Sequence, residues 1–310
     1  MALTNSARDA KGTPSTCQPA HNGVKGAGPL AGGSEGGRRG WGTPATKRPL
    51  LPSSITPPSL AVRIFAVWYR HVRVYTKNLV SNGLPPFLEP LIFLTGIGLG
   101  LGKYVPQMGG IAYVSFLASG LFVSTAMLTA AFECSFGTFI RMEFNKVYDG
   151  MLAAPISVEN LLVGEILWAG TKGFFFSFAV LCIVVAFGIM PVSYTLLVPF
   201  VGLLTGMMFG ALSLLITSYV KTITYFNFYF SGFLSPMFFF SGVVFPLENL
   251  PEPLIVLAYA LPLTHAVRLS RALCLGSFSS YLLLDLLYML AFTLIVGYLA
   301  IGRLRGRLLD

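Results

Sequence analysis

Three histidines and four cysteines are the side chains of this 310-residue chain best suited to metal binding, proton transfer or nucleophilic attack. They are His21, His71, His265, Cys17, Cys134, Cys182 and Cys274. The four cysteines are widely scattered and form no close ligand pair, and the three histidines are far from one another, so neither a zinc site nor a disulfide framework is implied. The sequence therefore predicts isolated histidines, no metal site, and a chain that is not an enzyme.

Four glycines before a lysine resemble a phosphate-binding loop. They are Gly96, Gly98, Gly100 and Gly102, followed by Lys103. A Walker loop requires Gly, four residues, then Gly-Lys-Ser/Thr, whereas Ile97 and Tyr104 stand at the two outer positions here. This segment is therefore not a nucleotide site. In a membrane helix, glycines four residues apart let another helix approach closely, which makes Gly96 and Gly100 candidates to face a second copy of the chain.

Charged and aromatic side chains also occur inside long apolar segments. Lys172 follows Glu165 by seven residues on the same helical face, and both are costly in hydrocarbon, so they should face protein, water or a polar substrate. A translocation path and a structural salt bridge are both open interpretations. Tyr225 and Tyr229 share a face and could stack against sugar rings or acyl chains, although packing within a helical bundle explains them equally simply.

The elements that must position these residues are long apolar segments. Hydrophobic residues make up 55% of the chain, charged residues 11%, and the mean hydropathy is +0.73. A bilayer core requires about 20 helical residues per crossing. Six segments meet this requirement, at about 84–102, 111–132, 161–189, 195–220, 223–245 and 281–302. The fold class predicted is an all-α membrane protein with six transmembrane helices.

The distribution of lysine and arginine predicts the orientation. Most of the 21 basic residues lie before residue 84, at 141–146 and at 303–307, which six crossings place on one side. Basic loops resist translocation, so both termini are expected to be cytoplasmic. The net charge of +9 is then a topology signal, and no nucleic-acid partner is expected.

Two domains are expected. Residues 1–57 are rich in Gly, Pro and Ser without apolar periodicity, which predicts a disordered cytoplasmic head, while residues 58–310 form the membrane domain. At its start, residues 60–77 predict an amphipathic helix, with Ile64, Phe65 and Trp68 on its apolar face. This helix should lie in the cytoplasmic interface, against lipid, either as an anchor or as a grip for a partner.

A second amphipathic helix is predicted between the second and third spans. Its candidate residues for docking a soluble motor are Arg141, Glu143, Phe144, Val147, Tyr148 and Met151. Apolar side chains at helical spacing would dock in a groove and the charges would set the register, and Pro155 ends the helix. An idle helix on the lipid surface is the alternative.

The connection between the fifth and sixth spans predicts a re-entrant or interfacial outer hairpin. Its characteristic residues are Gly242, Pro246, Pro262, His265 and Arg268. The apolar run Leu254 to Leu261 is too short to cross a bilayer. Irregular backbone at this depth is tolerated where protein or water covers it.

These elements together resemble the permease subunit of type-2 ATP-binding-cassette (ABC) exporters, in the nodulation-protein-J and daunorubicin-permease branch. The resemblance covers about residues 58–308 and is carried by Leu152-Ala153-Ala154-Pro155-Ile156-Ser157, Phe240-Ser241-Gly242, Phe245-Pro246 and Leu261-Pro262-Leu263-Thr264-His265. It implies a bacterial inner-membrane half-transporter that pairs with a second copy, as a homodimer. It also implies a separate cytoplasmic ATPase, holding ATP and Mg, that docks at about 141–153.

The resemblance further implies export of a lipo-oligosaccharide, with a drug or a polysaccharide as the alternative cargo. A secondary transporter driven by an ion gradient is the competing class. Such a protein ordinarily has repeated halves and acidic residues near the midplane. Glu89, Glu133 and Asp285 are expected near span ends, which argues against it.

Overall fold

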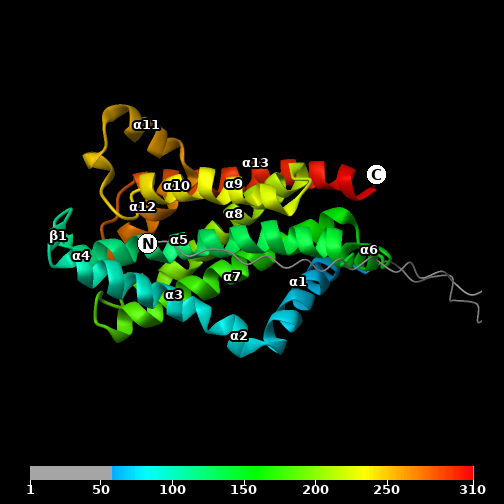
Figure 1. Ribbon diagram of the computed structural model, residues 1–310, viewed down its shortest axis with the longest axis horizontal. Coiled ribbons are helices and arrows are strands. Elements are labelled where there is room, and N and C mark those ends of the chain that lie inside the picture. Colours follow the sequence, from blue (N-terminus) through cyan, green and yellow to red (C-terminus); the bar gives the residue numbers. More distant parts are fainter. Residues whose placement is uncertain (1–57, 310) are drawn as a thin grey trace, which may run out of the picture. The chain divides into compact units, whose positions relative to one another are not determined.

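The computed structural model describes residues 58–309 and is almost entirely helical, which confirms the predicted all-α membrane class (Figure 1). Its two short strands, β1 (Gln107–Met108) and β2 (Ile111–Ala112), form an antiparallel hairpin with Met108 opposite Ile111. The predicted head, residues 1–57, lies outside the described residues. The account below therefore concerns the membrane domain.

The described chain begins with the predicted amphipathic helix. Helix α1 (Leu60–Lys77) has the predicted bounds, with Val67 and His71 buried on its inner face. Three further helices, α2 (Leu79–Gly83), α3 (Pro85–Phe93) and α4 (Gly100–Gly102), are joined through the π-helical segment η1 (Leu94–Leu99). The first span therefore begins at Leu79, five residues before the predicted start, because the helix continues through the prolines at 85 and 86.

The remaining elements follow in chain order. They are α5 (Tyr113–Phe132), η2 (Glu133–Gly137), η3 (Ile140–Phe144), α6 (Val147–Leu152), α7 (Val158–Ala186), η4 (Tyr194–Leu197), α8 (Val198–Tyr219), η5 (Ile223–Tyr225), α9 (Phe226–Tyr229), η6 (Phe230–Leu234), α10 (Ser235–Phe240), η7 (Leu247–Asn249), α11 (Glu252–Ala260), α12 (Pro262–Leu275) and α13 (Tyr281–Leu309). Segments η2, η3 and η6 are π-helical, whereas η4, η5 and η7 are 3-10 turns.

Within residues 58–309, five helices are long and apolar enough to cross a membrane. They span Leu79–Gly102, Tyr113–Phe144, Val158–Ala186, Tyr194–Tyr219 and Tyr281–Leu308. The pair α11 and α12, bent by 87° at Leu261, makes a sixth if it is counted as one broken span. The predicted fifth span, 223–245, is a helical segment made of η5, α9, η6 and α10 in direct succession; it ends at Phe240 and is not among the five.

The core forms where α7 and α8 approach each other through glycine. A Cβ atom at Gly173 would lie 2.5 Å from the carbonyl oxygen of Gly202, so only glycine fits this crossing. Helix α5 packs against both helices, and α13 covers α8. The buried core is therefore built from α5, α7 and α8, with α1 and α13 on its outside.

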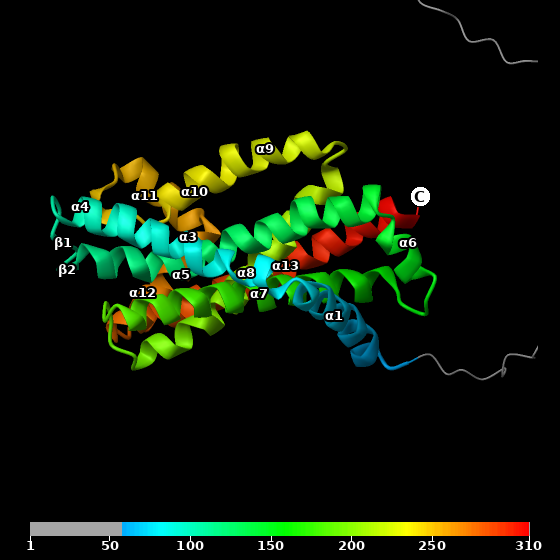
Figure 2. The same ribbon diagram turned by 60° about the horizontal axis from the view of Figure 1, so that its bottom comes forward.

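The bundle has two distinct ends. Helix α6 and the end of α13 lie at one, called here the C-terminal end, while β1, β2 and α11 lie at the other, called the hairpin end (Figure 1). Helix α1 runs obliquely to the long helices (Figure 2). It approaches α7 closely because Gly164 leaves room for Val67, where a Cβ atom would be only 2.6 Å from a Val67 methyl group.

Candidate functional site

Glu165 is the centre of a buried ion network at the C-terminal end. Its side chain, on α7, is fully buried. One carboxylate oxygen, Oε1, accepts a hydrogen bond from the Tyr148 hydroxyl at 2.7 Å and lies 3.0 Å from Nε2 of His71. The other oxygen, Oε2, accepts from Nη2 of Arg141 at 2.8 Å. Both oxygens are therefore used by neighbours within the chain.

Arg141 extends the network to a second carboxylate. Its Nη1 donates to Oε1 of Glu133 at 2.7 Å, and Lys172 Nζ lies 2.9 Å from Oε2 of the same residue. The network therefore alternates in sign from Glu165 through Arg141 and Glu133 to Lys172. Buried charges persist only when they are paired and hydrogen-bonded, and this arrangement meets that condition.

The network joins elements that are far apart in the chain. His71 belongs to α1, Tyr148 to α6, Glu165 and Lys172 to α7, and Glu133 begins the π-helical segment η2. A further hydrogen bond, 2.9 Å from the Trp68 indole nitrogen to the Thr171 hydroxyl, attaches α1 to α7, and the His71 ring stacks on Trp168. The network therefore connects α6 with α7 and α1 through hydrogen bonds.

The segment predicted as one docking helix is divided in two. Arg141, Glu143 and Phe144 end the long helix that starts at Tyr113, whereas Val147, Tyr148 and Met151 lie in α6. Lys146 separates the two parts with a left-handed backbone, at φ 48°. This conformation is unfavourable for a residue with a Cβ atom, so the sharp turn is held by the contacts on either side of it.

The two aromatic residues of this segment face opposite environments. Phe144 is 65% exposed, while Tyr148 is fully buried. Burial, together with the nearby Glu165 carboxylate, raises the pKa of Tyr148 well above its usual range, so the hydroxyl remains a donor at neutral pH. Val147 and Met151 pack against the core. Of the six predicted docking residues, Phe144 is thus the large apolar side chain left open to a partner.

A second ion pair ties the end of the long helix to the C-terminus. Nη2 of Arg307 lies 2.9 Å from Oε1 of Glu143, and Nη1 donates at 2.6 Å to the backbone carbonyls of Thr217 and Val220. Arg307 therefore holds η3, α8 and α13 together. At the C-terminal end of the bundle, Glu143 before the Lys146 turn pairs with Arg307, and Tyr148 after the turn bonds to Glu165.

The four residues predicted to line a translocation path, Glu165, Lys172, Tyr225 and Tyr229, lie in two separate parts of the structure: two belong to the ion network and two to the segment after α8. Glu165 and Lys172 do not pair with each other, because each finds a different partner in the network. Tyr229 is buried, with its hydroxyl 2.9 Å from that of Ser213 on α8, whereas Tyr225 is 55% exposed. The structure gives Glu165 and Lys172 the contacts of a structural ion network.

The hairpin end carries a smaller polar cluster around Asp285 on α13. Oδ1 of Asp285 lies 2.7 Å from Nδ1 of His265 and 3.2 Å from Nη1 of Arg268. Gly242 has a positive φ of 80°, and its carbonyl accepts from Arg271 at 2.8 Å. Pro262 opens α12 and Pro246 precedes η7. Most of the predicted hairpin residues therefore mark turns and helix junctions.

Several expectations about isolated groups are wrong. His71 and His265 each face a carboxylate, while His21 lies outside the described residues. Glu89 and Glu133 lie well inside the spans Leu79–Gly102 and Tyr113–Phe144 rather than near their ends, because both helices extend beyond the predicted limits. Sequence spacing gave no signal for these pairs, since 94 positions separate His71 from Glu165.

Residues 58–309 hold no group of three His, Cys, Asp or Glu side chains placed to bind a metal ion.

Comparison with known proteins places the chain in a family. Residues 62–275 match the ABC-2 type transporter family. Nodulation protein J of Sinorhizobium fredii is 33% identical over 245 residues, which cover 79% of this chain and 94% of the relative. Nodulation protein J of Bradyrhizobium diazoefficiens is 30% identical over 253 residues, covering 81% and 96%.

A more distant relative is the inner membrane transport permease YadH of Escherichia coli. It is 22% identical over 190 residues, which cover 61% of this chain and 74% of the relative. The family match, the near-complete coverage of the nodulation proteins and the apolar helical bundle agree with one another. The chain belongs to the ABC-2 type transporter family, as a multi-pass permease of the nodulation protein J branch.

Proposed function

We propose that this chain is the permease of an ABC exporter that moves a lipo-oligosaccharide, or a related amphipathic glycoconjugate, out of the cytoplasm. The family and the nodulation protein J relatives support the exporter class. ATP and Mg would bind a separate ATP-binding-cassette subunit, and the permease itself would hold no cofactor. A drug or polysaccharide exporter of the same family is the alternative.

The C-terminal end of the bundle is proposed to face the cytoplasm of a bacterial cell, from the inner membrane. Arg141, Lys146 and Lys221 belong to this end, as do the arginines that close α13, and such clusters resist translocation. Both termini would then be cytoplasmic. The inner-membrane permease of Escherichia coli among the relatives supports the same location.

A homodimer is proposed, with α1 lying against lipid in the interface. Gly96 and Gly100 support this assembly, because a Cβ atom built at either would meet nothing within 4 Å in the described chain. Gly98 and Gly102, by contrast, pack on Val114. One face of the first span is therefore used within the chain and the other is open to a second copy.

The observation that carries the proposal is the buried network that joins α6 to α7 and α1. An ATPase bound over the exposed Phe144 ring and α6 would move Tyr148, whose hydroxyl bonds to Glu165. Because both Glu165 oxygens are bonded, the displacement would pass to His71 and Arg141 rather than be absorbed locally. ATP-driven closure would thereby change the packing of the spans.

The test is co-reconstitution of the permease with its ATPase in proteoliposomes. Phe144→Asp should reduce ATPase association at least tenfold and abolish ATP-dependent export, while leaving insertion and thermal stability unchanged because the ring is exposed. Tyr104→Asp is the matched control, since Tyr104 is an 85% exposed aromatic residue near the hairpin end. Normal association of the Phe144→Asp variant would contradict docking at this segment.

Cargo is identified in the same vesicles. A lipo-oligosaccharide, a polysaccharide precursor and an amphipathic cationic drug are added in turn, and the cargo that stimulates ATP hydrolysis and crosses the membrane is the substrate. Transport that requires no ATPase and follows an imposed proton gradient would overturn the exporter and identify a secondary transporter.

A further inference from the structure

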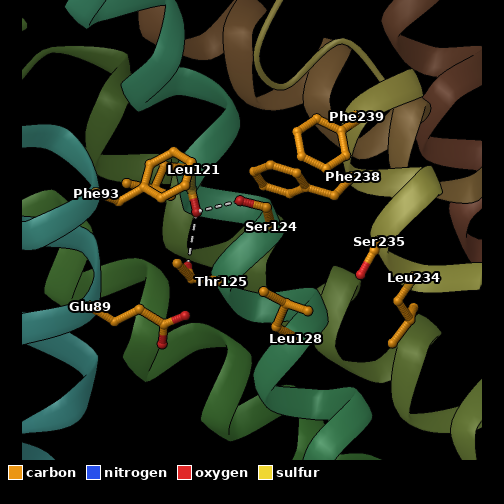
Figure 3. Close-up of a pocket in the computed structure, with 10 residues that line it drawn as sticks. All are labelled: Glu89, Phe93, Leu121, Ser124, Thr125, Leu128, Leu234, Ser235, Phe238 and Phe239. Atoms are coloured by element: carbon orange, nitrogen blue, oxygen red, sulfur yellow. Dashed lines mark hydrogen bonds between the residues drawn. The ribbon is translucent and has the colours of Figure 1, made fainter. Parts of the chain in front are cut away.

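A pocket of about 200 Å³ opens between α3, α5 and α10, away from the ion network (Figure 3). Its wall is mainly apolar, with Phe93 from α3, Leu121 and Leu128 from α5, and Phe238 from α10. The Phe93 and Phe238 rings meet edge to face at 5.9 Å and connect α3 with α10. The apolar lining suits an acyl chain or a ring face.

Glu89 provides the pocket with a carboxylate. Its side chain reaches from α3 toward Thr125 and Leu128 (Figure 3). No residue between 58 and 309 forms a hydrogen bond or an ion pair with this carboxylate. A carboxylate well inside a membrane span is costly unless a polar group meets it. Glu89 therefore has two oxygens available to a group from outside the chain.

Three hydroxyl groups complete the polar wall. Ser124 and Thr125 donate to the Leu121 carbonyl at 3.3 and 2.9 Å, and Ser235 donates to the Phe230 carbonyl at 3.0 Å. Each hydroxyl hydrogen is thus used by the backbone of its own helix. The oxygen lone pairs remain, so in this arrangement these side chains, like the carboxylate, present hydrogen-bond acceptors to a ligand.

We propose that this pocket is a cargo subsite for a polar group that donates hydrogen bonds, carries no negative charge and is attached to an apolar chain or ring. The inference rests on the proposed export function and specifies its substrate class. A wall that presents acceptors offers a phosphate or carboxylate a donor only if a hydroxyl leaves its backbone carbonyl, and it places the anion beside Glu89, whose charge repels it. A purely apolar molecule would leave the carboxylate unpaired.

Two chemical sources fit this description, namely the hydroxyl and amide groups of a sugar and a protonated amine. The pocket is smaller than the 300–1,000 Å³ or so typical of whole drug-sized ligands. It therefore accommodates one sugar ring or one amine with the adjoining carbons, and the rest of the cargo extends beyond it. This subsite would select the head group rather than the whole molecule.

The experiment uses the permease in nanodiscs without ATPase, and four photoreactive probes that share one dodecyl chain with a diazirine near the head. The heads are glucose, permethylated glucose, a primary amine and a phosphate. Labelling of residues 121–128 and 234–239 is quantified by mass spectrometry. The glucose probe, the amine probe or both should label these residues about tenfold more than the permethylated and phosphate probes. Equal labelling by the phosphate probe would overturn the proposal.

Two substitutions test the carboxylate and separate the two sources. Glu89→Leu should lower labelling by the accepted probe about tenfold. Glu89→Gln keeps a carbonyl acceptor, so it should preserve labelling by a sugar but abolish the preference for an amine. Glu252→Gln, an exposed carboxylate on α11 outside the pocket, is the matched control. Unchanged labelling in Glu89→Leu would overturn the inference.

The comparison of head groups on the unsubstituted protein requires no variant, so a variant that fails to fold does not remove the test. Because the assay contains no ATPase, its result is independent of docking and of transport. If the pocket residues show no selective labelling while ATP-dependent export is intact, the subsite is refuted and the export proposal stands. If labelling is selective but no ATPase associates with the permease, the export proposal is refuted and the subsite stands.

Discussion

Glu165 and Glu89 are the same residue type on two membrane helices, and they differ in what surrounds them. Glu165 is fully buried and bonds to Tyr148, His71 and Arg141. Glu89 lines an apolar pocket and has no hydrogen bond or ion pair from any residue between 58 and 309. A carboxylate with a full set of internal partners maintains the fold, whereas a carboxylate without them is available to a ligand.

This difference separates two regions that sequence composition alone treats as equivalent. At the C-terminal end the charges are matched internally, so the region proposed to couple to the ATPase has little capacity left for cargo. In the pocket between α3, α5 and α10 the polar atoms are acceptors that lack a donor. Coupling and recognition are therefore expected to respond to different substitutions.

The largest effect is expected for Arg141→Ala. This substitution leaves the carboxylates of Glu133 and Glu165 without their shared guanidinium, and an unpaired buried charge costs about 3–5 kcal/mol. The midpoint of thermal unfolding in detergent should fall by roughly 10 °C. Arg305→Ala is the matched control, because its pair with Glu159 is 60% and 40% exposed and such pairs contribute little. Equal shifts for the two variants would contradict the network's structural role.

The direct comparison is Glu165→Gln against Glu89→Gln. The first removes a charge that three donors contact, and each hydrogen bond to a charged group is worth about 1.5–3 kcal/mol. The second removes a charge without an internal partner, so the unfolding midpoint should stay unchanged or rise slightly. Calorimetry on both purified variants measures the two unfolding midpoints. A larger fall of the midpoint for Glu89→Gln than for Glu165→Gln would show that Glu89, and not Glu165, is the structural carboxylate.

A smaller effect is expected for Tyr148→Phe. The ring still fills its buried site, and only the 2.7 Å hydrogen bond to Glu165 is lost, at a cost of about 1.5 kcal/mol. If this bond carries movement from α6, the export rate per ATP hydrolysed should fall more than the stability does. Export and hydrolysis are measured in the same vesicles. A parallel fall of both rates, without any change in their ratio, would place the coupling elsewhere.

The helices were largely predictable because their signals are local. The amphipathic pattern over 60–77 corresponds to α1 at both ends, and the last span begins at Tyr281 as predicted. Apolar length and periodicity determine such elements without reference to distant residues. The end of the helical segment 223–240, at Phe240, was not predicted, since the sequence stays largely apolar through Val243, Val244 and Phe245.

The candidate sites were predictable only in part. Lys172 and Glu165 were correctly identified as unusual in an apolar segment, but their spacing suggested a pairing with each other. Lys172 instead bonds to Glu133, 39 positions away, and Glu165 bonds to Arg141, 24 positions away. Such partners depend on how α5 and α7 pack, which helical periodicity within one segment does not specify.

Glu133 and Arg141 lie in the π-helical segments η2 and η3, so the helical geometry between them determines the direction in which each side chain points. Each residue added to a helix rotates the following side chains by about 100°. A π-helical turn holds about one residue more than an α-helical turn, so loss of a single codon within η2 can be absorbed by conversion of that turn to α-helix, which leaves Arg141 facing Glu165. Insertion of a residue would instead turn Arg141 away, so gene variation in this stretch should lack insertions, whereas the exposed turn between β1 and β2 can gain or lose residues.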